Sequence, residues 1–199
     1  MVNVVEVSAV MFAFLLMGAD PIAPLTALMI LWVNLVSDAI PSLALGVEVE
    51  EPDLMQRSPR PRSESFFAEN LGTRIVLRGL VVGWLTYYIF DFALDRGYDM
   101  AYAQTEAFVL LIFAQMFHIF DARTSTTLFR RNPFTNKYLI WAVAGSGLLS
   151  LAAVYSHFGN LVLGTVPIQG NHLLMVIMIS ALPTFILSGI KEIFSLRWL

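Results

Sequence analysis

Long apolar stretches alternate with short polar segments along the whole chain. The apolar stretches lie at residues 2–17, 25–47, 73–94, 105–121, 138–155 and 172–190. An α-helix needs about 20 residues to cross the hydrocarbon core of a bilayer, and most of these stretches reach or approach that length. The pattern predicts an all-α fold, a polytopic membrane bundle of six transmembrane helices in a single domain over residues 1–199. The first stretch is short and looks truncated, which indicates either a start inside a longer reading frame or a chain that begins in mid-helix.

The composition supports a membrane protein and excludes several kinds of site. Hydrophobic residues make up 57% of the 199 positions and charged residues only 14%, which is not the balance of a soluble domain. The chain has no cysteine, so it has no disulfide framework and no thiolate metal site. Its three histidines are scattered and do not predict a zinc site. The expected surroundings are the lipid bilayer, with no nucleic-acid partner.

The basic residues predict how the helices are oriented. Eleven of the twelve Lys and Arg residues follow the second, fourth or sixth stretch, and only Arg96 lies on the opposite side. Cytoplasmic loops carry such an excess of positive charge, so we expect both termini to be cytoplasmic. The longest cytoplasmic loop, residues 48–72, begins with acidic residues and continues with a cluster of Pro and Arg. We expect an extended strap that contacts lipid headgroups or a soluble partner, or that serves only as the orientation signal.

The second stretch carries the polar residues of greatest interest. In LWVNLVSDAIPSLALG, Asn34, Ser37 and Asp38 fall on one face of a helix because they are three or four positions apart. An acid in the middle of a bilayer is costly unless it is paired or solvated, so Asp38 indicates a functional site. Pro41 has no amide hydrogen for the carbonyl of Ser37, and we expect a kink there that frees backbone oxygens. Oxygen ligands of this kind suit a hard cation such as Ca²⁺, Na⁺ or Mg²⁺; the alternative is a kinked helix whose polar face bonds to its neighbours.

Other stretches contribute further polar residues. Asn3 and Glu6 share a face of the first stretch, and Glu6 together with Asp38 would balance a divalent cation. Gln115 lies near the middle of the fourth stretch, where a hydrogen bond between helices competes with a role as a ligand. Glu106, at the outer end of the same stretch, is expected to be near water.

The fifth stretch contains a patch of small residues: Gly145, Ser146, Gly147 and Ser150. Small residues let two membrane helices approach closely, so the patch predicts a packing surface. We attach no chemistry to it.

The polar residues of the second stretch belong to a longer motif. NLVSDAIPSLALG followed by EEPDLMQRSPRPRSE resembles the sixth transmembrane helix and following loop of type II P-type cation-transporting ATPases, above all the calcium pumps of the sarcoplasmic-reticulum type and their bacterial relatives. Asn3-Val-Val-Glu6 resembles the N-x-x-E of the family's fifth helix, and NPFTNK resembles the loop before the ninth. The resemblance covers essentially the whole chain as the fifth to tenth helices, and it implies a bundle that binds and transports a cation.

The resemblance implies a set of cation ligands: Asn3, Glu6, Asn34, Ser37, Asp38 and Gln115. Ser37 replaces the family's usual threonine and keeps its hydroxyl. Gln115 stands where the sarcoplasmic-reticulum pumps have a glutamate, so a formal charge is missing and one of their two calcium sites is in question. The implied cargo is Ca²⁺, and a single site or a different hard cation stays open.

The catalytic parts of the family have no counterpart in these residues. The sequence contains no D-K-T-G segment, whose aspartate is phosphorylated, and no P-E-G-L stretch of the fourth helix. The resemblance therefore implies that the chain has no catalytic or cofactor-binding residues and does not hydrolyse ATP alone, with ATP and Mg²⁺ acting only through missing domains. The implied partners are the cytoplasmic actuator, phosphorylation and nucleotide domains and the first four helices of the full pump, in a bacterial plasma membrane. The alternatives are a self-contained six-span carrier or channel-like protein, and a non-transporting membrane assembly subunit.

Overall fold

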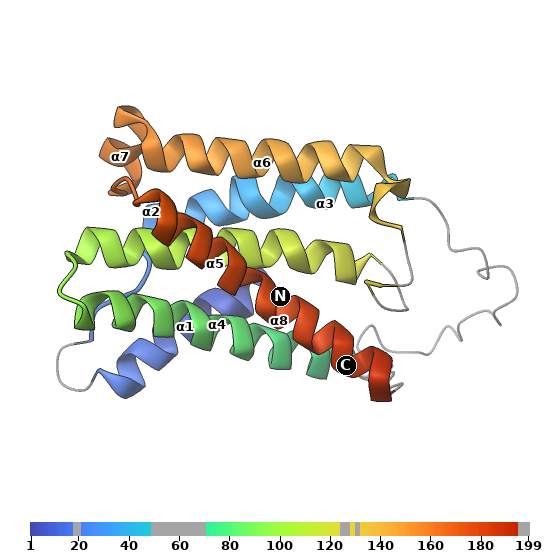
Figure 1. Ribbon diagram of the computed structural model, residues 1–199, viewed down its shortest axis with the longest axis horizontal. Coiled ribbons are helices and arrows are strands. Elements are labelled where there is room, and N and C mark those ends of the chain that lie inside the picture. Colours follow the sequence, from blue (N-terminus) through green and yellow to red (C-terminus); the bar gives the residue numbers. More distant parts are fainter. Residues whose placement is uncertain (18–20, 49–70, 124–127, 130–131, 195–199) are drawn as a thin grey trace, which may run out of the picture.

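Every element in the described residues is a helix (Figure 1). The computed structural model describes residues 1–17, 21–48, 71–123, 128–129 and 132–194, so the strap expected at 48–72 lies, except for its ends, outside the described residues. The helices are α1 (Val2–Leu16), α2 (Ala27–Trp32), η1 (Val33–Asp38), α3 (Ala39–Leu45), α4 (Leu71–Asp95), α5 (Met100–Ala122), η4 (Pro133–Thr135), α6 (Lys137–Tyr155), α7 (His157–Leu163) and α8 (Gly170–Phe194). The predicted all-α fold is confirmed.

Within those ranges, five helical segments are long and apolar enough to cross a membrane. They are α2, η1 and α3 taken as one continuous segment, and then α4, α5, α6 and α8. α1 is shorter, with 15 residues, and begins midway along the bundle in Figure 1. α5 begins at Met100 rather than at residue 105, because the polar residues of its first turns pack against other parts of the protein. The polytopic helix bundle predicted from hydropathy is confirmed.

α5 occupies the middle of the bundle and organises the other spans (Figure 1). It packs against α4, α6, α8 and η1, while α1 packs on α4 and α3 packs on α6. Phe108 of α5 and Phe90 of α4 are completely buried in the core between them. The outer helices turn large apolar side chains outward, as Leu43 and Trp141 show. Because lipid is as apolar as these side chains, this surface suits a bilayer.

α1 and α4 approach each other closely at two glycines of α4. A Cβ atom added at Gly83 would lie 2.9 Å from the carbonyl oxygen of Val5 and would overlap the hydroxyl of Ser8. One added at Gly79 would lie 2.5 Å from Cγ1 of Val4. The Ser8 hydroxyl donates to the carbonyl of Gly79 at 3.1 Å across this contact. The two helices therefore pack backbone against backbone, as small residues allow in membranes.

Replacing Gly83 by valine is expected to separate α1 from α4 and to destabilise the bundle by about 2 kcal/mol, the usual cost of overpacking a close contact. Gly145 of α6 is the matched control, since a Cβ atom there would meet nothing within 4 Å. Thermal unfolding of the two valine variants in detergent compares them. Equal stability of the variants would contradict the close contact.

The helix of the second span changes its hydrogen-bonding pattern in its middle. α2 begins after Thr26, whose hydroxyl accepts a bond from the amide of Met29 at 3.2 Å. η1 is a π-helix, and α3 resumes at Ala39 and continues through Pro41. In a helix the amide of each residue donates to the carbonyl four residues earlier, or five residues earlier in a π-helix, and proline has no amide hydrogen to donate. The irregularity expected at Pro41 therefore lies in the turn before it, and single π-helical turns are frequent at functional sites.

Candidate cation site

Two of the predicted ligands, on different spans, contact each other directly. The amide nitrogen Nδ2 of Asn34, on η1, donates to both carboxylate oxygens of Glu6, on α1, at 3.0 and 3.2 Å. The same nitrogen donates to the carbonyl of Ile30 at 3.0 Å. Glu6 is buried and Asn34 is half-buried. None of these bonds uses the carbonyl oxygen Oδ1 of Asn34, which keeps its capacity to accept.

Three further predicted ligands line one cavity. It has a volume of about 190 Å³ and lies between the second span and α5. Its polar lining comes from Ser37, Asp38, Ser42, Gln115 and His118, and the remainder is mainly apolar. Because a water molecule takes up about 30 Å³ in the liquid, the space is large enough for a cation with several waters.

Two of the lining side chains have polar atoms without protein partners. Gln115 is 8% exposed, and its Oε1 and Nε2 atoms are both buried without a hydrogen bond in the part of the chain that the structure describes. Asp38 is half-buried, and it forms no hydrogen bond or ion pair with any described residue. Buried polar groups without partners are costly, so the cavity favours a polar occupant. An aspartate, a carboxamide and a hydroxyl together suit a hard cation.

The sixth predicted ligand neither lines the cavity nor joins these contacts. Asn3 is exposed near the start of α1 and forms no hydrogen bond with a described residue. Nor do the described residues contain a group of three His, Cys, Asp or Glu side chains placed to hold a metal ion. The oxygen atoms available to a cation therefore come from different kinds of group. The cavity has one carboxylate, that of Asp38, and the second carboxylate, that of Glu6, accepts hydrogen bonds from Asn34.

Two serines of α6 contact the π-helix, and sequence reasoning missed them as part of the site. Ser146 donates to the carbonyl of Val36 at 2.9 Å. The hydroxyl of Ser150 lies 3.4 Å from that of Ser37 and accepts a bond from the indole nitrogen of Trp32 at 3.1 Å. Both serines belong to the small-residue patch expected only to pack. The sequence alone does not indicate which helix the two hydroxyl groups face.

A buried ion pair lies beside the cavity and joins three spans. Nη1 of Arg78, on α4, is 2.5 Å from Oδ2 of Asp121, on α5, and 3.0 Å from Nδ1 of His118. Ser188 of α8 donates to the other oxygen of Asp121 at 2.8 Å. His118 is therefore held by α4 while it lines the cavity, so α4 and α8 both help to position that wall.

A second buried acid lies outside the cavity. Glu106 is 2% exposed, although its place near the outer end of a span predicts a position near water. Its Oε1 atom lies 3.0 Å from Nδ1 of His172 on α8. The expectation was wrong because α8 covers this end of α5, which hydropathy along α5 cannot report.

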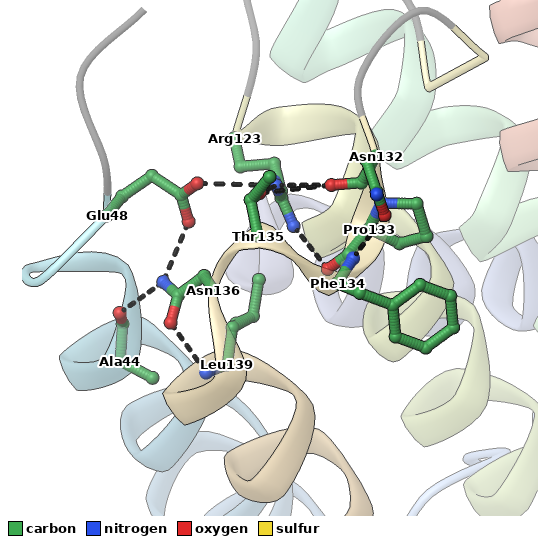
Figure 2. Close-up of polar contacts among 9 residues, drawn as sticks. All are labelled: Ala44, Glu48, Arg123, Asn132, Pro133, Phe134, Thr135, Asn136 and Leu139. Carbon is green, nitrogen blue, oxygen red and sulfur yellow. Dashed lines mark hydrogen bonds and ion pairs between the residues drawn. The ribbon is translucent and has the colours of Figure 1, made fainter.

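A cluster of polar contacts ties the end of the second span to the start of α6 (Figure 2). Nδ2 of Asn136 donates to the carbonyl of Ala44 at 3.1 Å and to Oε2 of Glu48 at 2.8 Å, while its Oδ1 accepts from the amide of Leu139 at 3.0 Å. Asn136 thus caps α6 and satisfies a terminal carbonyl of α3. Arg123 adds an ion pair to Glu48 at 3.4 Å. The start of η4 holds Arg123 in turn, since the guanidinium donates to the backbone carbonyls of Asn132 and Pro133 (Figure 2).

Replacing Asn136 by alanine is expected to cost about 2 kcal/mol, because the change removes a helix cap and the hydrogen bonds that the side chain donates to Glu48 and to the carbonyl of Ala44. The carbonyl of Ala44 then keeps the more distant amide of Val47, at 3.4 Å, as a donor. Asn132 provides the matched control. Its side chain accepts a hydrogen bond from the amide of Phe134 in an exposed turn. Its backbone carbonyl, which accepts from Arg123, is unchanged by the substitution to alanine. Thermal unfolding in detergent should show a loss for Asn136→Ala several times larger than for Asn132→Ala.

Comparisons with known proteins show the family of the chain. The family model described as "Cation transporting ATPase, C-terminus" matches residues 22–193. A calcium-transporting ATPase of Bacillus subtilis (strain 168) is 45% identical over 188 residues, which are 94% of this chain and 21% of that protein. Calcium-transporting ATPase 1 of Bacillus cereus is 34% identical over 76% of the chain and 19% of the relative. Calcium-transporting ATPase 1 of Yarrowia lipolytica is 30% identical over 86% of the chain and 18% of the relative.

The chain thus spans about a fifth of the length of these relatives. The match covers the second to the last span, including the π-helix and the helices that surround it. The resemblance inferred from the motifs is confirmed, and the chain belongs to the family that forms the C-terminal membrane region of calcium-pump-like P-type cation-transporting ATPases.

Proposed function

We propose that this chain is the ion-binding membrane part of an ATP-driven pump whose cargo is Ca²⁺. The observation that carries the proposal is the cavity between the second span and α5. There a half-buried aspartate, Asp38, and a buried carboxamide, Gln115, meet without protein partners among the described residues. The names of the relatives support calcium as the cargo, and the oxygen donors are those that calcium prefers.

In this proposal Asp38, Ser37 and Gln115 bind the ion from the cavity wall. Asn34 adds a ligand from the same π-helix as Ser37 and Asp38, and Glu6 and Asn3 complete the ligand set from α1. The hydrogen bonds of Asn34 use its nitrogen, so its Oδ1 is available to the cation. The two carboxylates, Asp38 and Glu6, balance the charge of one divalent ion.

ATP hydrolysis takes place, in this proposal, on domains that these 199 residues do not contain. The actuator, phosphorylation and nucleotide domains and four further helices would act as partners, with ATP and Mg²⁺ bound there. We place the chain in a bacterial plasma membrane with the C-terminal end of α8 on the cytoplasmic side, while α1 begins midway along the bundle (Figure 1). The distribution of basic residues supports this orientation, because the ends of α3, α5 and α8 and the starts of α4 and α6 lie at one end of the bundle (Figure 1).

A hybrid pump tests the proposal. The chain is joined behind the preceding part of the Bacillus subtilis calcium-transporting ATPase, and inverted membrane vesicles are assayed for ATP hydrolysis and for uptake of radioactive calcium. The hybrid is expected to hydrolyse ATP only with calcium and to accumulate calcium, whereas the chain alone does neither. Calcium movement by the chain alone without ATP would favour a self-contained carrier. A correctly inserted hybrid whose ATP hydrolysis ignores calcium would contradict the proposed site.

A further inference from the structure

α6 contacts the ligand-bearing turn through two hydroxyl groups. Ser150 is 2% exposed and Ser146 is completely buried, so water does not compete for either hydroxyl. Ser150 accepts from the indole nitrogen of Trp32 and approaches the hydroxyl of Ser37. The two serines are four positions apart, and therefore both face the second span from the same side of α6.

The chemistry of Ser150 fits an acceptor of two hydrogen bonds. A hydroxyl oxygen has two lone pairs, and the indole nitrogen of Trp32 can only donate. The second lone pair of Ser150 is therefore available for the proton of Ser37. When Ser37 donates in that direction, both of its own lone pairs remain for other partners, and Ser37 lines the cavity.

Ser146 acts on the backbone of the same turn. It donates to the carbonyl of Val36, five residues before Pro41, and proline has no amide hydrogen to offer that carbonyl. A buried carbonyl without a donor is costly, so Ser146 supports the helix where the proline interrupts its bonding. α6 thus holds both the backbone and a ligand side chain of the π-helix.

We propose that Ser150 is a positioning residue for cation binding, which accepts a hydrogen bond from the Ser37 hydroxyl and so turns the lone pairs of the Ser37 oxygen toward the cation. The inference rests on the proposed function, since it assumes that Ser37 binds the ion. Ser146 keeps the turn in place while Ser150 orients the ligand. A serine that served only to pack the helices would affect calcium affinity independently of Ser37.

The test measures equilibrium binding of radioactive calcium to the full 199-residue chain in phosphatidylcholine vesicles. Ser150→Ala is expected to weaken binding about 10-fold, the lower range for loss of a group that orients a metal ligand. Ser150→Thr keeps the hydroxyl and is expected to stay within about 3-fold of the parent chain. Ser180→Ala is the matched control, because Ser180 is fully buried and donates to the carbonyl of Ile177 in its own helix, α8.

The decisive comparison uses Ser37→Ala as a second background. If Ser150 acts through Ser37, the double variant binds calcium as weakly as Ser37→Ala alone. Independent effects that multiply, or a Ser150→Ala chain that binds like the parent, would overturn the inference and leave the proposed site standing. A parent chain that binds no calcium would overturn the proposed function and this inference together. Ser150→Cys, nearly equal in size and a weak hydrogen-bonding group, replaces the alanine variant if that variant does not fold.

Discussion

Replacing Asp38 by asparagine is expected to weaken calcium binding by about 100-fold, which corresponds to roughly 3 kcal/mol. Asparagine has nearly the size of aspartate, so the cavity keeps its shape and only the negative charge and one strong oxygen donor are lost. The number of charged ligands is what sets calcium affinity over several orders of magnitude. Equilibrium binding to the chain in vesicles, and calcium-dependent phosphorylation of the hybrid pump, measure the loss.

Asp95→Asn is the control for this substitution. Asp95 is an exposed carboxylate at the end of α4 and does not line the cavity. α4 ends at the opposite end of the bundle from the ends of α3 and α5 (Figure 1). Its loss removes the same charge from the chain without touching the site, so calcium affinity should stay the same. If the Asp38→Asn variant binds calcium as tightly as the parent chain, Asp38 is not a ligand and the proposed mechanism is wrong.

Replacing Asp121 by leucine is expected to give the largest loss of stability, about 3 to 5 kcal/mol. Asp121 is 3% exposed, and its two oxygens face Arg78 and Ser188. The leucine removes the carboxylate that lies closest to a buried guanidinium, so the positive charge of Arg78 loses much of its compensation. The effect is measured by heating the protein in detergent and recording the fraction that stays monodisperse at each temperature.

A double variant separates this charge effect from packing. Combining Asp121→Leu with Arg78→Met removes both charges, and stability is expected to recover by at least half, because two apolar side chains can replace a buried ion pair. Additive losses in the double variant would show that the two side chains contribute independently. Lys137→Met changes a basic residue at an exposed helix start and should have little effect.

The spans could be predicted from the sequence because the bilayer leaves a long apolar segment few other structures. Backbone polar groups in hydrocarbon must bond within the segment, which requires a helix. Hydropathy was less informative for α5, where polar residues at the outer end are covered by protein. Gln104 donates to the carbonyl of Ala23, and Glu106 is bound by His172. Glu106 in particular looks like the border of a span in the sequence although it is buried in the bundle.

The candidate site was predictable only in part. Asp38 stands out because a lone acid in a bilayer requires an explanation. Ser37 belongs to the motif around it, whereas Gln115 was implied as a ligand only by the resemblance to the pump family. The π-helix was not predictable, since it differs from an α-helix by one residue in a turn and leaves the pattern of residue types unchanged. Ser150 was missed because a serine in a membrane helix bonds to whatever lies opposite, and only the fold shows that this is Ser37.

The buried acids of α5 also bear on how the protein is made. Glu106 and Asp121 each receive a partner from α8, which leaves the ribosome last of all the described helices. Until then α5 holds two carboxylates that its earlier neighbours satisfy incompletely. The central helix therefore cannot reach its final state during synthesis, and a nascent chain arrested before residue 170 should be a substrate for quality-control proteases.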